Sequence, residues 1–158
     1  MSKKLVAYFS ASGITAKLSE RLAQSIGADI FEIKPETPYT SDDLNWKDKH
    51  SRSSVEMNDR SSRPAISNIV DNIDQYDTVF VGFPIWWHRE PSIIDTFIEQ
   101  YDFKNKNIVP FATSGESTIG DISSNIKELA KGANVAEGRR FESDVSSVEL
   151  SKWATKEI

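Results

Sequence analysis

Short apolar runs that alternate with longer amphipathic segments are the feature of this sequence that most constrains its fold. The first run, at 5–9, consists of strand-forming residues and is apolar throughout, as in a strand buried on both faces. After it, apolar residues recur at helical spacing from Ile14 to Ile26, and Gly27 can end this helix. Strands are predicted over 5–9, 30–33, 79–83, 108–112 and 135–141. Helices are predicted over 14–26, 65–73, 92–101, 119–129 and from 148 to the C-terminus.

This order of elements predicts an α/β fold. Strands that alternate with helices form βαβ units, whose strands lie parallel. The predicted strands favour a single doubly wound five-stranded parallel sheet with strand order 2-1-3-4-5, in which ligands bind at the carboxyl ends of the strands. The 158 residues suit one domain, which we expect to span 1–158.

One segment does not fit the alternation. Residues 34–63 show little periodicity and hold Tyr39, Trp46 and several charged side chains, whereas connections between elements normally run about 2–6 residues. Two interpretations stay open at this stage. The segment is either an exposed insertion or a flap that covers the ligand site.

Composition narrows the chemistry that this chain can perform. It has no cysteine and only two histidines, which argues against disulfides, thiolate chemistry and histidine-rich metal sites. Any redox chemistry must therefore come from a bound organic cofactor. The net charge of −5 argues against a nucleic-acid partner and leaves room for a basic protein partner. No apolar run approaches the ~18 residues of a membrane span, so we expect no membrane partner and a cytoplasmic location.

The loop Ser10-Ala11-Ser12-Gly13-Ile14-Thr15 has the features of an anion site. It joins a strand to a helix, so backbone N–H groups at the start of the helix point outward. Ser10, Ser12 and Thr15 add hydroxyl groups, and Gly13 permits a close approach of the backbone. Neither a P-loop nor the dinucleotide pattern G-x-G-x-x-G is present. We expect the loop to hold a phosphate group, and an ordinary helix cap is the alternative.

The loop at 82–91 contains two adjacent tryptophans, Trp86 and Trp87. Neighbouring residues of an extended segment point in opposite directions, so one indole can join the core while the other faces a cavity or solvent. A flat aromatic ligand would stack on the second indole. The alternative is that both indoles pack under the loop. His88 is either an ordinary loop residue or a hydrogen-bond donor to the ligand ring.

A third loop, at 113–120, again offers hydroxyl groups and glycines after a predicted strand. By itself it is compatible with a simple loop and helix cap. Because the carboxyl ends of parallel strands meet at one edge of the sheet, the three loops together predict a pocket. The phosphate would lie at the first loop and an aromatic ring between the second and third.

Together, the patterns S-x-S-G-x-T, G-F-P-I-W-W and T-S-G-x-S-x-x-G resemble those of the flavodoxin family. The stretch Pro-Tyr-Thr-x-Asp-Asp-Leu at 38–44 and the pair Arg63-Pro64 narrow the resemblance to short bacterial flavodoxin-like proteins. The resemblance implies FMN as the cofactor. The sequence departs from the family pattern at Glu116, where glycine is usual, and at the charged pair Arg89-Glu90.

The resemblance also assigns roles to residues of the three loops. The resemblance implies that the phosphate group is held by Ser10, Ser12, Gly13, Ile14 and Thr15. For one edge of the isoalloxazine ring it implies Pro84, Ile85, Trp86 and Trp87. For the other edge it implies Thr113, Ser114, Gly115 and Ser117, with Gly120 closing the turn.

The function that this resemblance favours is electron transfer between redox partners, with no residue needed as a catalyst. The partner would be a protein or a small-molecule acceptor. An NAD(P)H-dependent FMN reductase of quinones or other small acceptors is the alternative, and a cofactor-free interaction domain is a third possibility. Two other users of this architecture are excluded. A phosphorelay receiver needs aspartates where Ser10 and Pro84 stand, and a low-molecular-weight phosphatase needs a cysteine.

Overall fold

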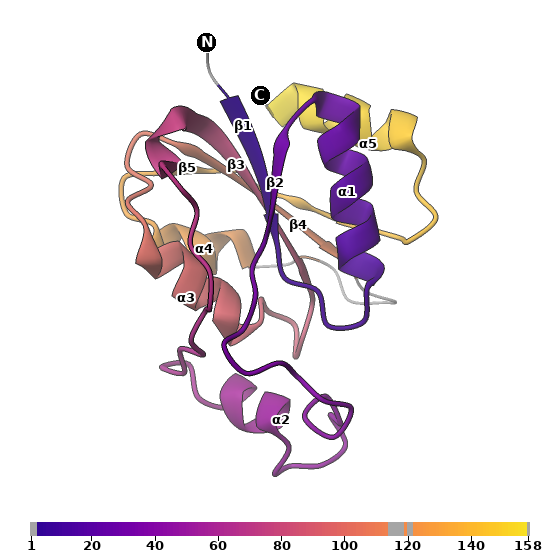
Figure 1. Ribbon diagram of the computed structural model, residues 1–158, viewed down its shortest axis with the longest axis vertical. Helices are drawn as coiled ribbons and strands as arrows, with labels where there is room; N and C mark the ends of the chain where they lie inside the picture. Colours follow the sequence, from indigo (N-terminus) through magenta and orange to yellow (C-terminus); the bar gives the residue numbers. More distant parts are fainter. Residues whose placement is uncertain (1–2, 114–118, 120–121, 158) are drawn as a thin grey trace.

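The computed structural model describes residues 3–113, 119 and 122–157. Figure 1 shows a central parallel sheet, in which β1 (Lys3–Tyr8) lies between β2 (Asp29–Glu32) and β3 (Tyr76–Pro84). The next strand, β4 (Asn107–Thr113), pairs in parallel with β3. The order β2-β1-β3-β4-β5 confirms the predicted doubly wound fold.

The last strand of the sheet is divided in two. β5 (Asn134–Val135) pairs with the start of β4, and β6 (Arg139–Phe141) pairs with its end. One continuous strand over 135–141 was expected, and that prediction is wrong. The chain turns at Gly138, whose φ is 83°, and a Cβ at this position would lie 2.6 Å from the carbonyl oxygen of Pro110. Only glycine combines this backbone conformation with so close an approach to β4.

Helices cover both faces of the sheet. α1 (Ile14–Ile26) and α5 (Ser147–Glu157) lie side by side on one face, and α3 (Ser92–Gln100) and α4 (Ile122–Leu129) lie on the other (Figure 1). A short 3₁₀ turn, η1 (Ile73–Gln75), leads into β3. Within the described ranges, no helix combines the length and the apolar character that crossing a membrane requires.

Each face of the sheet has its own hydrophobic cluster, because neighbouring residues of a strand point to opposite faces. In β1, Leu5 and Ala7 pack in the cluster that includes α3 and α4, whereas Val6 packs in the cluster that includes α1 and α5. All three side chains are buried. Burial on both faces explains why the strand sequences are continuous apolar runs rather than alternating ones.

The predicted helix over 65–73 is wrong. Most of this segment is non-helical, and Ile66 forms an antiparallel bridge with Pro35. The N–H group of Ser67 donates to the carbonyl oxygen of Lys34 at 2.8 Å. Backbone groups that a helix would pair internally are therefore paired with the chain that follows β2, and this tertiary contact overrides the helical spacing of the apolar residues.

The segment 34–63 contains one short helix, α2 (Arg52–Met57), which lies beyond the carboxyl ends of the strands (Figure 1). Ser51 caps this helix, because its Oγ accepts a hydrogen bond from the N–H group of Ser54.

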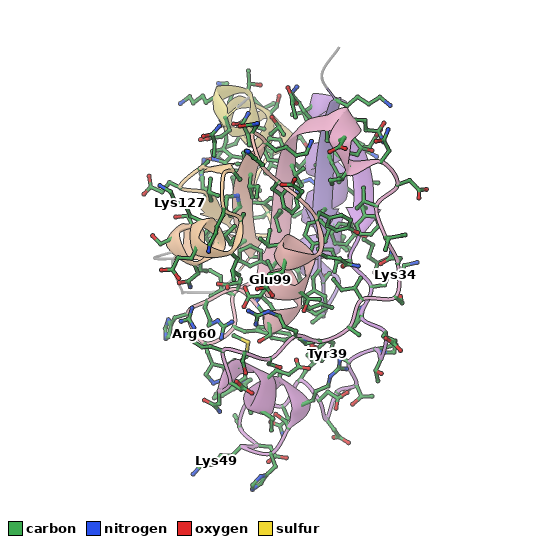
Figure 2. The ribbon with its side chains drawn as sticks, turned by 90° about the vertical axis from the view of Figure 1, so that its left-hand side faces the viewer. Lys34, Tyr39, Lys49, Arg60, Glu99 and Lys127 are labelled. Atoms are coloured by element: carbon green, nitrogen blue, oxygen red, sulfur yellow. The ribbon has the colours of Figure 1, made fainter. Side chains whose placement is uncertain are left out.

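Tyr39 joins this segment to the rest of the fold. Its ring meets the ring of Phe9 edge-on at 5.6 Å, and its hydroxyl group donates to Glu56 of α2 at 2.5 Å. Figure 2 shows Tyr39 between the sheet and α2. Trp46, farther along the segment, is 68% exposed. The inner part is thus packed against the carboxyl edge of the sheet, and the outer part is an exposed insertion. That the segment also covers a ligand stays a prediction.

Candidate cofactor-binding site

A cavity of about 600 Å³ opens at the carboxyl ends of the strands. Its volume lies within the range of about 300–1,000 Å³ that is typical of small-molecule sites. The residues that line it come from the last residues of β3, β4 and β6 and from the segments that follow β1, β3 and β6. They are Ser12, Ile14, Pro84, Ile85, Trp86, Thr113, Phe141, Glu142, Ser143 and Asp144.

The start of α1 contributes backbone donors to this region. Gly13 precedes the helix with a φ of 93°, and its N–H group donates to the Oγ of Ser10 at 3.0 Å. The first helical hydrogen bond runs from the N–H group of Lys17 to the carbonyl oxygen of Gly13, so the N–H groups of 14–16 have no partner within the helix. No described side chain caps them, and the first turn carries no acidic residue. These donors suit a phosphate group.

The hydroxyl groups of this loop have different surroundings. Ser12 is exposed and lines the cavity, whereas the Oγ of Ser10 accepts the hydrogen bond that shapes the turn. Thr15 is buried, and its hydroxyl group lies 2.8 Å from that of Thr113 in β4. Ser12 is therefore the loop hydroxyl placed to meet a ligand directly, while Ser10 and Thr15 hold the loop in position.

A tight hairpin follows β3 at the edge of the cavity. The backbone N–H and carbonyl groups of Trp86 both bond to those of Arg89, each at 3.0 Å. The two residues between them, Trp87 and His88, have φ values of 50° and 63°. This is the two-residue turn that matches the twist of a hairpin, and it normally uses asparagine or glycine. Tryptophan in this conformation is strained by about 1–2 kcal/mol.

The hairpin separates the two tryptophans. Trp86 lines the cavity, and its ring meets those of Phe9 and Tyr39 edge-on at 5.6 Å. Trp87 is 39% exposed at the tip of the turn beside the exposed His88. The structure therefore places Trp86 at the cavity wall. Trp87 and His88 lie at the tip, outside the set of described residues that line the cavity.

One wall of the cavity was not anticipated from the sequence. Residues 141–144, which follow β6, supply four of its lining side chains, including the acidic residues Glu142 and Asp144. Their position in the sequence could have predicted them, because they follow the last strand of the sheet, as each of the other site loops follows a strand. The third predicted loop, at 113–120, is described only at Thr113 and Ile119. Ser114, Gly115, Ser117 and Gly120 lie outside the described residues.

The doubly wound sheet, the uncapped start of α1 and the aromatic wall at Trp86 define a cofactor site of the flavodoxin class. The chain matches the Flavodoxin family over residues 3–157 and belongs to it. No match was found among curated proteins.

Solved structures of relatives agree with this assignment. A candidate flavoprotein from Bacteroides eggerthii is 48% identical, with a TM-score of 0.93 and coverage of 99% of this chain and 98% of that one. A second, from Bacteroides uniformis, is 44% identical, with a TM-score of 0.92 and 98% coverage of both chains. A Lactobacillus acidophilus flavoprotein, solved in complex with FMN, is 24% identical, covers 98% of this chain and 99% of that one, and has a TM-score of 0.74, which shows a shared fold.

Proposed function

We propose that this chain is an FMN-binding electron carrier that passes electrons between redox partners. The observation that supports it most is that one cavity contains Ser12, beside the uncapped start of α1, and the aromatic wall at Trp86. A phosphate group and a flat ring are the two recognisable parts of FMN. Membership of the flavodoxin family supports the same cofactor.

The residues present fit such a ligand at both ends. The N–H groups of 14–16 and the hydroxyl group of Ser12 donate to the phosphate, with the positive end of the α1 dipole behind them. Pro84, Ile85 and Trp86 form the apolar wall for the ring. When bound, FMN supplies the redox chemistry by accepting and releasing electrons, while the protein tunes its potential through contacts and charge.

The charge around the cavity suits a basic partner. Glu142 and Asp144 line it, both are exposed, and the whole chain carries a net charge of −5. Complementary charge speeds the encounter of two proteins and is screened by salt. We therefore propose a redox partner protein with a basic docking surface, and a small-molecule acceptor is the other option.

The experiment has two stages. An absorption spectrum of the purified or reconstituted protein, followed by acid release and mass determination, should identify FMN; FAD or no flavin would contradict the proposal. The photoreduced protein should then pass electrons to cytochrome c, a basic acceptor, at a rate that falls with added salt. If the protein instead oxidises NADPH with a quinone and no other protein, it is a reductase and not a carrier.

A further inference from the structure

The arginine that ends the hairpin beside the cavity is buried. Arg89 is 8% exposed, the adjacent Glu90 is 1% exposed, and Asp95 in the first turn of α3 is 3% exposed. Charged side chains are rarely buried to this extent unless they are paired. The Nη2 group of Arg89 donates to Oδ2 of Asp95 at 2.8 Å and lies 3.9 Å from Oε2 of Glu90. A surface loop is thus joined to a helix of the core by a buried hydrogen bond between Arg89 and Asp95.

Other charged and polar groups complete the surroundings of this pair. Arg63, which is partly exposed, lies 3.9 Å from Asp95 and pairs with Glu99 of α3, which Figure 2 labels. On the other side, the amide group of Asn125 in α4 donates to Glu90 at 3.4 Å. The pair formed by Arg89 and Asp95 therefore lies between the hairpin, α3 and the chain that precedes β3.

The cluster is poorly arranged for stability alone. Among the described residues, no hydrogen-bond partner is found for Nε and Nη1 of Arg89, for Oδ1 of Asp95 or for Oε2 of Glu90. Unpaired buried polar atoms are costly, and a buried ion pair often stabilises no more than apolar residues of the same volume. Desolvation and then the neighbouring carboxyl group of Glu90 raise the pKa of Asp95 to about 8.

The hairpin is strained at its turn. Its turn places two bulky residues, Trp87 and His88, in a conformation that favours glycine, and both are exposed. Two backbone hydrogen bonds connect Trp86 to Arg89 across the turn. These bonds hold Trp86 and Arg89 together. An interaction that restrains the position of Arg89 therefore also restrains Trp86 at the wall of the cavity.

We infer that Arg89 is a positioning residue of the cofactor site: its buried hydrogen bond to Asp95 holds the strained hairpin in place and thereby keeps Trp86 against the cavity. The effect on flavin binding rests on the proposed function. The anchoring itself does not, and it can be measured on the protein without any ligand.

The anchoring is tested by amide hydrogen exchange of the ligand-free protein. Arg89→Met removes the anchor, and Arg63→Met is the matched control, because Arg63 also lies near Asp95 but outside the hairpin. We expect the N–H groups of Trp86 and Arg89 to exchange at least about tenfold faster in Arg89→Met and less than twofold faster in Arg63→Met. Arg89→Lys keeps the buried charge, and should show an intermediate rate even if Arg89→Met fails to fold.

The role in the cofactor site is tested by fluorescence titration with FMN and with riboflavin. Arg89→Met should raise both dissociation constants by about tenfold, because the hairpin forms the wall for the ring and not the phosphate site. Arg89→Lys should restore most of the affinity, and Arg63→Met should bind both ligands like the parent protein.

Each outcome decides one part of the inference. Unchanged exchange at Trp86 and Arg89 in both Arg89 variants overturns the anchoring. Faster exchange with unchanged flavin affinity overturns the role in the cofactor site. A loss for FMN that spares riboflavin places the damage at the phosphate loop and also overturns it. If the parent protein binds no flavin, the proposed function fails while the exchange result still decides whether Arg89 anchors the hairpin.

Discussion

The hydroxyl groups of Thr15 and Thr113 lie 2.8 Å apart in the interior and join the first turn of α1 to the end of β4. Thr113 also lines the cavity. Because α1 and β4 carry two of the loops that form the site, this hydrogen bond sets the position of one loop relative to the other.

The first prediction concerns this bond. Thr15→Val leaves the hydroxyl group of Thr113 buried without its partner, which costs about 1–3 kcal/mol. Urea denaturation of the ligand-free protein should show this loss in the free energy of unfolding. The double variant Thr15→Val with Thr113→Val should recover part of it, because no unpaired group remains. Thr155→Val on the exposed part of α5 is the control, and a Thr15 variant as stable as that control would contradict the prediction.

The second prediction distinguishes the two ends of the cavity. Ser12→Ala removes a hydroxyl donor beside the uncapped start of α1, and a hydrogen bond to a charged group is worth about 1.5–3 kcal/mol. We expect FMN to bind roughly ten- to a hundredfold more weakly, while riboflavin, which lacks the phosphate, binds as before. Both are measured by fluorescence titration. Ser25→Ala, near the far end of α1, should change neither affinity. Equal weakening of both ligands would assign Ser12 a structural role.

The third prediction compares the two tryptophans. Trp86 lines the cavity and Trp87 lies at the tip of the hairpin, so Trp86→Phe should weaken flavin binding more than Trp87→Phe. Aromatic pairs are worth about 0.5–1.5 kcal/mol beyond burial, so roughly 2- to 12-fold in the dissociation constant is the upper bound for a change that keeps a smaller ring. Riboflavin is the suitable probe, because it reports on the ring alone. If Trp87→Phe has the larger effect, the ring stacks at the tip of the hairpin and not on the wall formed by Trp86.

The fourth prediction follows from the buried carboxyl group of Asp95. Burial, followed by the neighbouring carboxyl group of Glu90, raises its pKa to about 8, from an ordinary value of 3.8. The folded state thus binds a proton that the unfolded chain releases near pH 4. The stabilisation that this proton provides is complete below the ordinary pKa of 3.8 and is lost as the pH rises through about 8.

The measurement is urea denaturation between pH 5 and pH 9, at intervals of about one unit. The parent protein should lose stability across this range, and Asp95→Asn should show a flatter profile, because the amide carries no titratable proton. Glu99→Gln, on the exposed side of the same helix, should keep the slope of the parent. A parent profile that is flat between pH 5 and pH 8 would contradict the assignment of this proton.

Much of the fold was predictable because it depends on local patterns. The apolar runs at 5–9, 79–83 and 108–112 are strands buried on both faces, and this burial leaves a direct signature in the sequence. The helix over 14–26 and its end at Gly27 were likewise predictable from spacing and from a residue that tolerates a positive φ. Alternation predicts a parallel sheet, and five strands favour the order 2-1-3-4-5, so the location of the site at the carboxyl edge needed no coordinates.

Only the tertiary structure decided the features that depend on distant partners. The apolar spacing over 65–73 is helical, yet the chain after β2 supplies its backbone partners and leaves it without a helix. The close approach to Pro110 splits the last strand at Gly138. The same holds at the site, where the contacts that place Trp86 and bury Arg89 come from Phe9, Tyr39 and Asp95. The physical reason is that periodicity reports which face of an element is buried, whereas the identity of the group packed against that face is set by residues far away in the chain.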